Sequence, residues 1–121
     1  RRFMNKRSLG KEKENLAAKF LESQGVQIVE KNFSCKMGEI DLIGVHKGYL
    51  VFVEVKYRSQ TTCGYPQEAV SKNKRRKICL VSNYYKMVKH YGETVKVRYD
   101  VVSILGNRIR WDKDAFNYDD L

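Results

Sequence analysis

The chain has 121 residues, of which 42% are hydrophobic and 31% are charged. This balance is typical of a folded globular domain and excludes a disordered chain. The length predicts one domain over residues 1–121, large enough to bury a core without disulfides. No apolar run is long enough to span a bilayer and no segment resembles a signal peptide, so we expect a cytoplasmic protein with no membrane partner. The formal net charge of +10 favours an anionic partner, first of all nucleic acid. The alternatives are a ribosome-adjacent or membrane-surface protein, or simply a basic soluble protein.

Apolar residues recur at helical spacing over residues 8–24 and predict a first helix that ends before Gly25. Residues 1–7 are expected to be disordered and to lie partly upstream of a native start at Met4. Glu14 projects along the packed face of this helix or along its margin. It is either a solvated flank of the helix or a functional carboxylate with a cation or hydrogen bonds nearby.

Three strands are predicted next, over residues 26–33, 37–45 and 49–58. The third is apolar on both faces, as expected of a central strand. Between the second and third strands, the two-residue turn Lys47-Gly48 places His46 opposite Tyr49. On the second strand, Ile40 and Leu42 are expected to share one face. Counting back from the turn puts two pairs of charged side chains on the other face: Asp41 opposite Glu54, and Glu39 opposite Lys56.

The remaining elements follow in order: a loop over residues 59–66, a second helix over 67–91, a fourth strand over 95–105, a short fifth strand over 108–111 and an acidic tail over 112–121. Arg98 and Asp100 interrupt the apolar pattern of the fourth strand. A structural ion pair at the edge of the sheet is preferred to a catalytic role for Asp100. The tail is expected to pack Ala115 and Phe116 against the domain.

The start of the second helix carries the densest positive run in the chain, residues 72–77. This run is either a solvated basic face or a surface that contacts phosphates, and the net charge favours the phosphate-contacting surface. The side chains assigned to nucleic-acid binding are Arg58, Lys72, Lys74, Arg75, Arg76 and Lys77.

Charged residues within apolar strands need a reason, because buried charge is costly unless it is paired or binds a metal. Asp41, Glu54 and Lys56 are the ingredients of metal-assisted phosphodiester hydrolysis. Carboxylate oxygens suit Mg²⁺ or Mn²⁺, and a lysine can orient the attacking water or stabilise charge on the phosphate. The roles predicted from the pattern are metal ligation by Asp41, Glu54 and the backbone carbonyl of Val55, catalysis by Lys56, and auxiliary or outer-shell roles for Glu39 and Glu14.

Several short motifs carry a family resemblance: Gly10-x-x-x-Glu14-x-x-Ala17, Asn32-Phe33, Gly38-Glu39-Ile40-Asp41-Leu42-Ile43, Val51-Phe52-Val53-Glu54-Val55-Lys56-x-Arg58, Glu68-Ala69-Val70-x-x-x-Lys74, Tyr99-Asp100-Val101-Val102 and Ala115-Phe116. Together they resemble the YraN family of small bacterial proteins, over essentially the whole chain from about Met4. That family is similar to the archaeal Holliday-junction resolvases, within the restriction-endonuclease-like PD-(D/E)xK nucleases. The resemblance implies an α/β fold with a mixed β-sheet flanked by helices, in the order α-β-β-β-α-β-β. It also implies catalytic roles for Glu14, Asp41, Glu54 and Lys56.

Two positions depart from the pattern of such nucleases. Lys13 stands where the family usually has glycine. Gln67 is present, but Ser71 replaces the tyrosine expected four residues later, so Gln67 is assigned only an auxiliary role.

Three functions are open at this point. The first is a metal-dependent endonuclease, with Mg²⁺ or Mn²⁺ as cofactor, that cleaves DNA, including branched or structured DNA, and acts as a homodimer. The second is a nuclease toxin domain of a bacterial competition system, held by an immunity protein and acting in the cytoplasm of the target cell. The third is a nucleic-acid-binding module that does not cleave. The intact set of Asp41, Glu54 and Lys56 favours an enzyme over a binding module.

Overall fold

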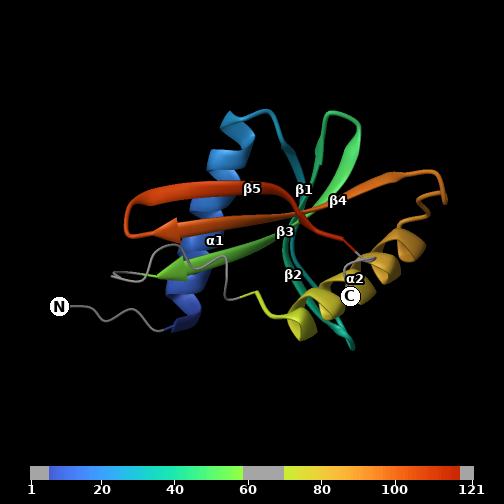
Figure 1. The fold of residues 1–121 in the computed structure, drawn as a ribbon, viewed down its shortest axis with the longest axis horizontal. Coiled ribbons are helices and arrows are strands. Elements are labelled where there is room, and N and C mark those ends of the chain that lie inside the picture. Colours follow the sequence, from blue (N-terminus) through green and yellow to red (C-terminus); the bar gives the residue numbers. More distant parts are fainter. Residues whose placement is uncertain (1–5, 59–69, 118–121) are drawn as a thin grey trace.

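The computed structural model describes residues 6–58 and 70–117 (Figure 1). Its elements are, in order, α1 (Lys6–Ser23), β1 (Gln27–Cys35), β2 (Gly38–His46), β3 (Tyr49–Arg58), α2 (Lys72–Val88), β4 (Lys96–Leu105) and β5 (Arg108–Phe116). The predicted order α-β-β-β-α-β-β and the α/β class are therefore confirmed. The predicted loop 59–66 and Gln67 lie outside the described residues.

Some boundaries differ from those predicted. Lys6 and Arg7 form the first turn of α1, although residues 1–7 were expected to be disordered. The helix α2 begins at Lys72, where Ser71 caps it by accepting a hydrogen bond from the Lys74 backbone N–H at 3.1 Å. At the other end, β5 runs through residues predicted to be tail, because Phe116 pairs with Tyr99 of β4.

The strands form one mixed sheet in the order β1-β2-β3-β4-β5. Neighbouring strands are antiparallel except β3 and β4, which are parallel. A parallel pair needs a crossover connection, and α2 lies on that crossover. The predicted central position of β3 is confirmed, since it lies between β2 and β4.

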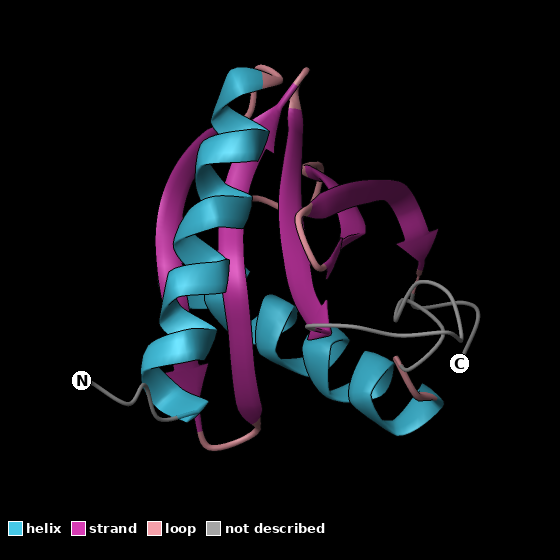
Figure 2. Cartoon of the chain, turned by 90° about the vertical axis from the view of Figure 1, so that its left-hand side faces the viewer, coloured by secondary structure: helices cyan, strands magenta, loops and turns pink. Residues whose placement is uncertain are grey.

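One helix covers each face of the sheet, as Figure 2 shows for α1. Ala17, Ala18 and Leu21 of α1 pack on one face, in a cluster that includes Leu42 and Val53. The helix α2 packs on the other face, in a cluster whose main members are Ile78, Val81 and Tyr85 of α2 with Ile43, Leu50 and Phe52 of the sheet. None of the helices in the described part of the chain is long and apolar enough to cross a membrane.

The turn between β2 and β3 confirms the predicted register. Lys47 and Gly48 have φ of 50° and 83°, the left-handed pair that a two-residue hairpin turn requires. His46 pairs with Tyr49, as predicted, and the same register continues along the hairpin as far as Leu42 and Val53.

Beyond that pair, the alternation of faces changes at Asp41. Leu42 packs in the cluster beneath α1, whereas Ile40 packs in the cluster beneath α2. The prediction that these two residues share a face was wrong. The physical reason is a local break in the strands: Asn32, which lies level with Asp41 on β1, has φ of 55°. A residue in this left-handed conformation interrupts a regular ladder.

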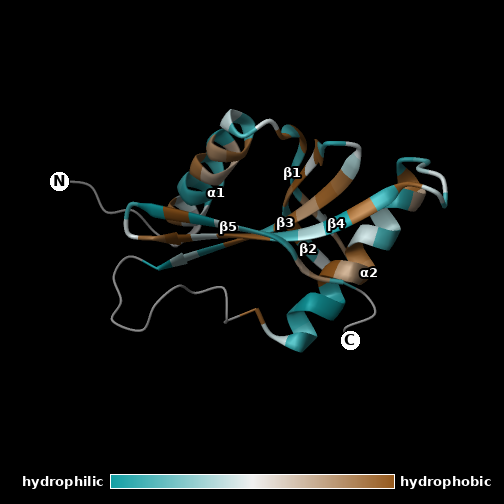
Figure 3. Cartoon of the chain, turned by 45° about the horizontal axis from the view of Figure 1, so that its top comes forward, coloured by the Kyte–Doolittle hydropathy of each residue, from teal (hydrophilic) through white to brown (hydrophobic). Residues whose placement is uncertain are grey.

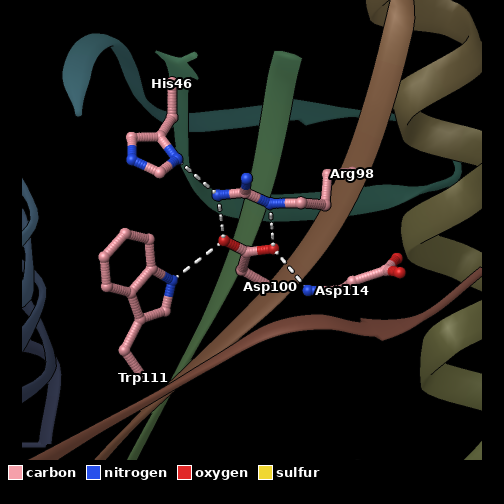
Figure 4. Close-up of polar contacts among 5 residues, drawn as sticks. All are labelled: His46, Arg98, Asp100, Trp111 and Asp114. Atoms are coloured by element: carbon pink, nitrogen blue, oxygen red, sulfur yellow. Dashed lines mark hydrogen bonds and ion pairs between the residues drawn. The ribbon is translucent and has the colours of Figure 1, made fainter. Parts of the chain in front are cut away.

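A second polar cluster lies in β4 and β5 (Figure 4). Arg98 donates to both carboxylate oxygens of Asp100, each at 2.9 Å. Trp111 Nε1–H and the Asp114 backbone N–H donate to the same carboxylate, and Arg98 Nη2 donates to His46 Nδ1 at 3.0 Å. The predicted structural ion pair is confirmed. Its expected place at a sheet edge was wrong, because β4 is an inner strand and Asp100 is 0% exposed.

Candidate active site

The candidate site lies where β2 and β3 part. Past the last pair of the regular register, Asp41 Oδ2 accepts a hydrogen bond from the Val55 backbone N–H at 2.8 Å. A side chain thus takes the place that a main-chain carbonyl would have in a regular ladder. Asp41 is held against β3 in this way, close to Glu54, as the register predicted.

The environment of Asp41 disfavours its negative charge. Burial, and after it the charges of Glu54 and Glu14, together raise the pKa of Asp41 from 3.8 to about 8. The hydrogen bond from Val55 opposes this shift. Carboxylates crowded with little solvent resist ionisation unless a positive charge joins them. This strand end therefore favours a proton or a cation at Asp41.

Glu14 reaches the same place from α1. It is half-buried, and the side chains of Asn32 and Asp41 lie close enough to lower the pKa of its carboxyl group by hydrogen bonding. Burial raises the pKa of Glu14, the hydrogen bonds lower it, and the charges of Glu39 and Glu54 raise it again. Glu14 was interpreted either as a solvated flank of the helix or as a functional carboxylate. Its half-buried position beside Asp41 does not fit a solvated flank.

Glu54 is the most buried member of the site. Its side chain is 4% exposed and its Oε2 lies 3.4 Å from Lys56 Nζ and 3.3 Å from Lys74 Nζ. Lys56 comes from the same strand, but Lys74 comes from the first turn of α2. The buried carboxylate is therefore neutralised by two ammonium groups from two elements.

The other predicted site residues lie around this centre or away from it. Glu39 is exposed and pairs with Ser34 of β1, because the pairing of β2 with β3 stops before it would face Lys56. Arg58 is exposed at the end of β3, and the exposed basic residues of α2 are Lys72, Lys74, Arg76 and Lys77. Arg75 is half-buried and lines a pocket of about 330 Å³ with Val70, Val101, Asp112, Lys113, Ala115 and Phe116.

The oxygen atoms around Asp41 and Glu54 can be tested for whether they suit a divalent cation. Within residues 6–58 and 70–117, no three Asp, Glu, His or Cys side chains are arranged to hold a metal ion. A cation would rest instead on two carboxylates, Asp41 and Glu54, and on the backbone carbonyl of Val55. Mg²⁺ is commonly bound through one or two carboxylates, with water and substrate phosphate completing its coordination. The crowding that raises the pKa of Asp41 is the feature that a cation would relieve.

Two contributors to this site were not foreseen in these roles. Asn32 was predicted only as part of a family motif, and Lys74 as part of a family motif and as a nucleic-acid contact. In the structure, Asn32 adjoins Glu14 and lowers its pKa, and Lys74 forms an ion pair with Glu54. The left-handed backbone of Asn32 could not be predicted from a hydrophobic pattern. The position of Lys74 could be predicted, because Lys74 precedes the buried Ile78 and Val81 by four and seven residues, and this spacing puts all three on one face of α2.

A mixed sheet with helices on both faces, and a carboxylate and lysine cluster where two strands part, places the chain among α/β proteins of nuclease-like fold. The model of a family described as uncharacterised protein family UPF0102 matches residues 13–104. The chain belongs to this family, also called YraN, and the resemblance found in its motifs is confirmed.

Individual relatives match this chain over nearly their whole lengths. A UPF0102 protein of Lachnoclostridium phytofermentans is 45% identical over 114 residues, covering 94% of this chain and 97% of the relative. One from Caldanaerobacter subterraneus is 39% identical over 115 residues, covering 95% and 93% respectively. One from Shewanella putrefaciens is 45% identical over 108 residues, covering 89% and 98%. These relatives are bacterial, and their names state no activity.

Proposed function

We propose that this protein is a divalent-metal-dependent endonuclease that hydrolyses phosphodiester bonds in DNA, with branched or structured DNA as the preferred substrate. The single observation that carries the proposal is the surroundings of Glu54. This buried carboxylate adjoins a second one, Asp41, whose pKa is raised to about 8. A lysine ammonium lies 3.4 Å from Glu54. A structural ion pair would not require the second carboxylate.

The chain's residues would share the chemistry as follows. Asp41, Glu54 and the Val55 carbonyl would hold the cation, which would neutralise charge on the scissile phosphate and lower the pKa of the attacking water. Lys56 is 23% exposed, so its ammonium can hydrogen-bond a phosphate oxygen or the water while remaining beside Glu54. Glu14 adjoins Asp41 from α1, so it would help to hold that carboxylate in position.

The basic run of α2 supports nucleic acid as the substrate. Lys72, Arg76 and Lys77 are exposed, and Figure 3 shows this end of α2 as strongly hydrophilic. Lys74, from the same run, contacts the site itself. A nucleic-acid backbone bound along these side chains would therefore pass beside Glu54. Each phosphate contact that is lost should lower the salt dependence of binding by about one unit of slope.

The direct test is cleavage of plasmid, linear and four-way-junction DNA, and of RNA, with Mg²⁺ or Mn²⁺ and with EDTA as the blank. We expect metal-dependent nicking by the wild type and loss of cleavage in Glu54→Gln and Asp41→Asn. Glu22→Gln is the matched control, because Glu22 is an exposed carboxylate in the last turn of α1, away from the site. Lys56→Gln should reduce the cleavage rate more than Mn²⁺ affinity, measured by calorimetry.

Two results would overturn the proposal in different ways. Cleavage that persists in Glu54→Gln would place the chemistry elsewhere or in a contaminant. Salt-sensitive DNA binding without cleavage under any divalent metal would indicate a binding module with a nuclease-like fold.

A further inference from the structure

Lys74 differs from the other basic residues at the start of α2. Its Nζ lies 3.3 Å from Glu54 Oε2, the oxygen that Lys56 also approaches. The side chain of Lys74 is 45% exposed, whereas that of Glu54 is 4% exposed. One end of this ion pair is thus open to solvent and the other is buried beneath it.

The position of Lys74 follows from the helix itself. Lys74 lies on the stripe of α2 that continues through the buried residues Ile78, Val81 and Tyr85. Ser71 fixes the first turn by accepting a hydrogen bond from the Lys74 backbone N–H at 3.1 Å. The stripe that packs on the sheet therefore begins with a lysine, and that lysine faces the parting of β2 and β3.

Helix stability does not explain a lysine there. The first turn of α2 holds no acidic residue. Cations at a helix N-terminus oppose the helix dipole and destabilise the helix. The contact with Glu54 offsets this cost, and it does so at the place where the proposed cation would bind.

We propose that Lys74 is a second lysine of the active site, distinct in role from the surrounding DNA-contacting residues. It neutralises Glu54 when no divalent cation is present. When a cation takes that carboxylate, the Lys74 ammonium turns outward and hydrogen-bonds a non-bridging oxygen of the DNA phosphate at the site. Lys56, less exposed at 23%, remains with Glu54. This inference rests on the proposed function for the identity of the phosphate, but its competition with a cation for Glu54 is independent of cleavage.

The test compares Lys74→Gln with Lys72→Gln. Both variants remove one positive charge from the same helical turn, but Lys72 is exposed and its side chain is not in the ion pair with Glu54. The first measurement is Mn²⁺ affinity without DNA, by calorimetry or electron paramagnetic resonance. Lys74→Gln should bind Mn²⁺ at least ~3-fold more tightly than the wild type, because an ammonium no longer competes at close range. Lys72→Gln should stay within ~2-fold, because its charge is exposed and screened.

The second measurement separates rate from affinity in single-turnover cleavage. At saturating DNA, Lys74→Gln should be slower than Lys72→Gln by ~10-fold or more, and Lys74→Arg should recover much of the rate. Lys72→Gln should bind DNA more weakly. Thermal melts of all variants confirm that they are folded.

The outcomes distinguish the two proposals. If Mn²⁺ affinity separates the two glutamine variants but the wild type cleaves no substrate, the endonuclease proposal fails and the place of Lys74 at the cation site stands. If Lys74→Gln matches Lys72→Gln in Mn²⁺ affinity and in rate at saturation, Lys74 is one more DNA contact and the inference is overturned. Absence of any Mn²⁺ binding by the wild type would overturn both.

Discussion

Replacement of Asp41 by Asn should stabilise the metal-free protein at neutral pH. The asparagine side-chain oxygen can still accept the hydrogen bond from Val55 N–H, which is 2.8 Å long in the wild type. The substitution removes the negative charge of Asp41, which burial and the charges of Glu54 and Glu14 all disfavour. The variant therefore relieves repulsion without leaving a cavity or an unpaired donor.

The magnitude follows from proton linkage. The pKa of Asp41 rises from 3.8 to about 8 on folding, so the folded protein binds this proton more tightly than the unfolded chain. The stabilisation that this proton provides is fully present below the unfolded pKa of 3.8 and is lost as pH rises through the folded pKa of about 8. Between them, wild-type stability falls by up to ~1.4 kcal/mol per pH unit, or ~2.7 kcal/mol from pH 5 to 7. The repulsion is shared with Glu14 and Glu54, so we expect ~1–3 kcal/mol over that interval.

The assay is urea unfolding in EDTA at pH 5, 6, 7 and 8. The excess stability of Asp41→Asn over the wild type should grow with pH, while Glu22→Gln, which changes an exposed carboxylate, should differ from the wild type by a constant amount. Saturating Mn²⁺ should then stabilise the wild type and leave Asp41→Asn unchanged. Because the cation displaces a proton, wild-type Mn²⁺ affinity should rise with pH up to about 8. A stability difference independent of pH would refute a raised pKa at Asp41.

Three further predictions concern residues that hold the site and the sheet. Asn32→Ala should cost ~1–2 kcal/mol in urea unfolding, because Asn32 has φ of 55°. Asn32→Gly should keep most of the stability but slow cleavage, because it removes the polar side chain beside Glu14. Asp100→Asn should cost ~3–5 kcal/mol, because it leaves the buried Arg98 guanidinium without its carboxylate; a loss below ~1 kcal/mol would contradict this. Burial and the charge of Arg98 lower the pKa of His46 below 6.5. The stability that the neutral imidazole contributes is therefore fully present above pH 6.5 and is lost as the pH falls through the lowered pKa. His46→Gln should therefore gain urea-unfolding stability relative to the wild type as pH falls from 7 to 5, and a difference that is independent of pH would exclude this role.

The predictions that held depend on interactions between close neighbours in the chain. The Lys47-Gly48 turn fixes which residues of β2 and β3 face each other, so the proximity of Asp41 and Glu54 could be counted from the sequence. Apolar periodicity likewise gave the order of helices and strands, since a face that must be buried repeats at the period of its element.

Apart from the shared face expected of Ile40 and Leu42, which the local break beside Asn32 overturned, the predictions that failed concern where an element lies relative to others. Arg98 and Asp100 were expected at a sheet edge, because two charges in an apolar strand are cheapest there. The structure instead buries them on an inner strand, where Trp111 and the Asp114 backbone complete their hydrogen bonds. The end of β5 was predicted too early for the same reason. The pairing of Phe116 with Tyr99 is a contact between strands, invisible in a window of sequence.

The sequence alone therefore determined the α/β class, the β2–β3 hairpin and the meeting of Asp41 with Glu54, because the geometry of the turn sets the register of the hairpin locally. Only the tertiary structure decided what surrounds that pair. The packing of α1 brings Glu14 to Asp41, the left-handed backbone at Asn32 interrupts the ladder, and the crossover helix α2 sets Lys74 against Glu54. These contacts join elements far apart in the chain, and their distances depend on how both helices pack on the sheet.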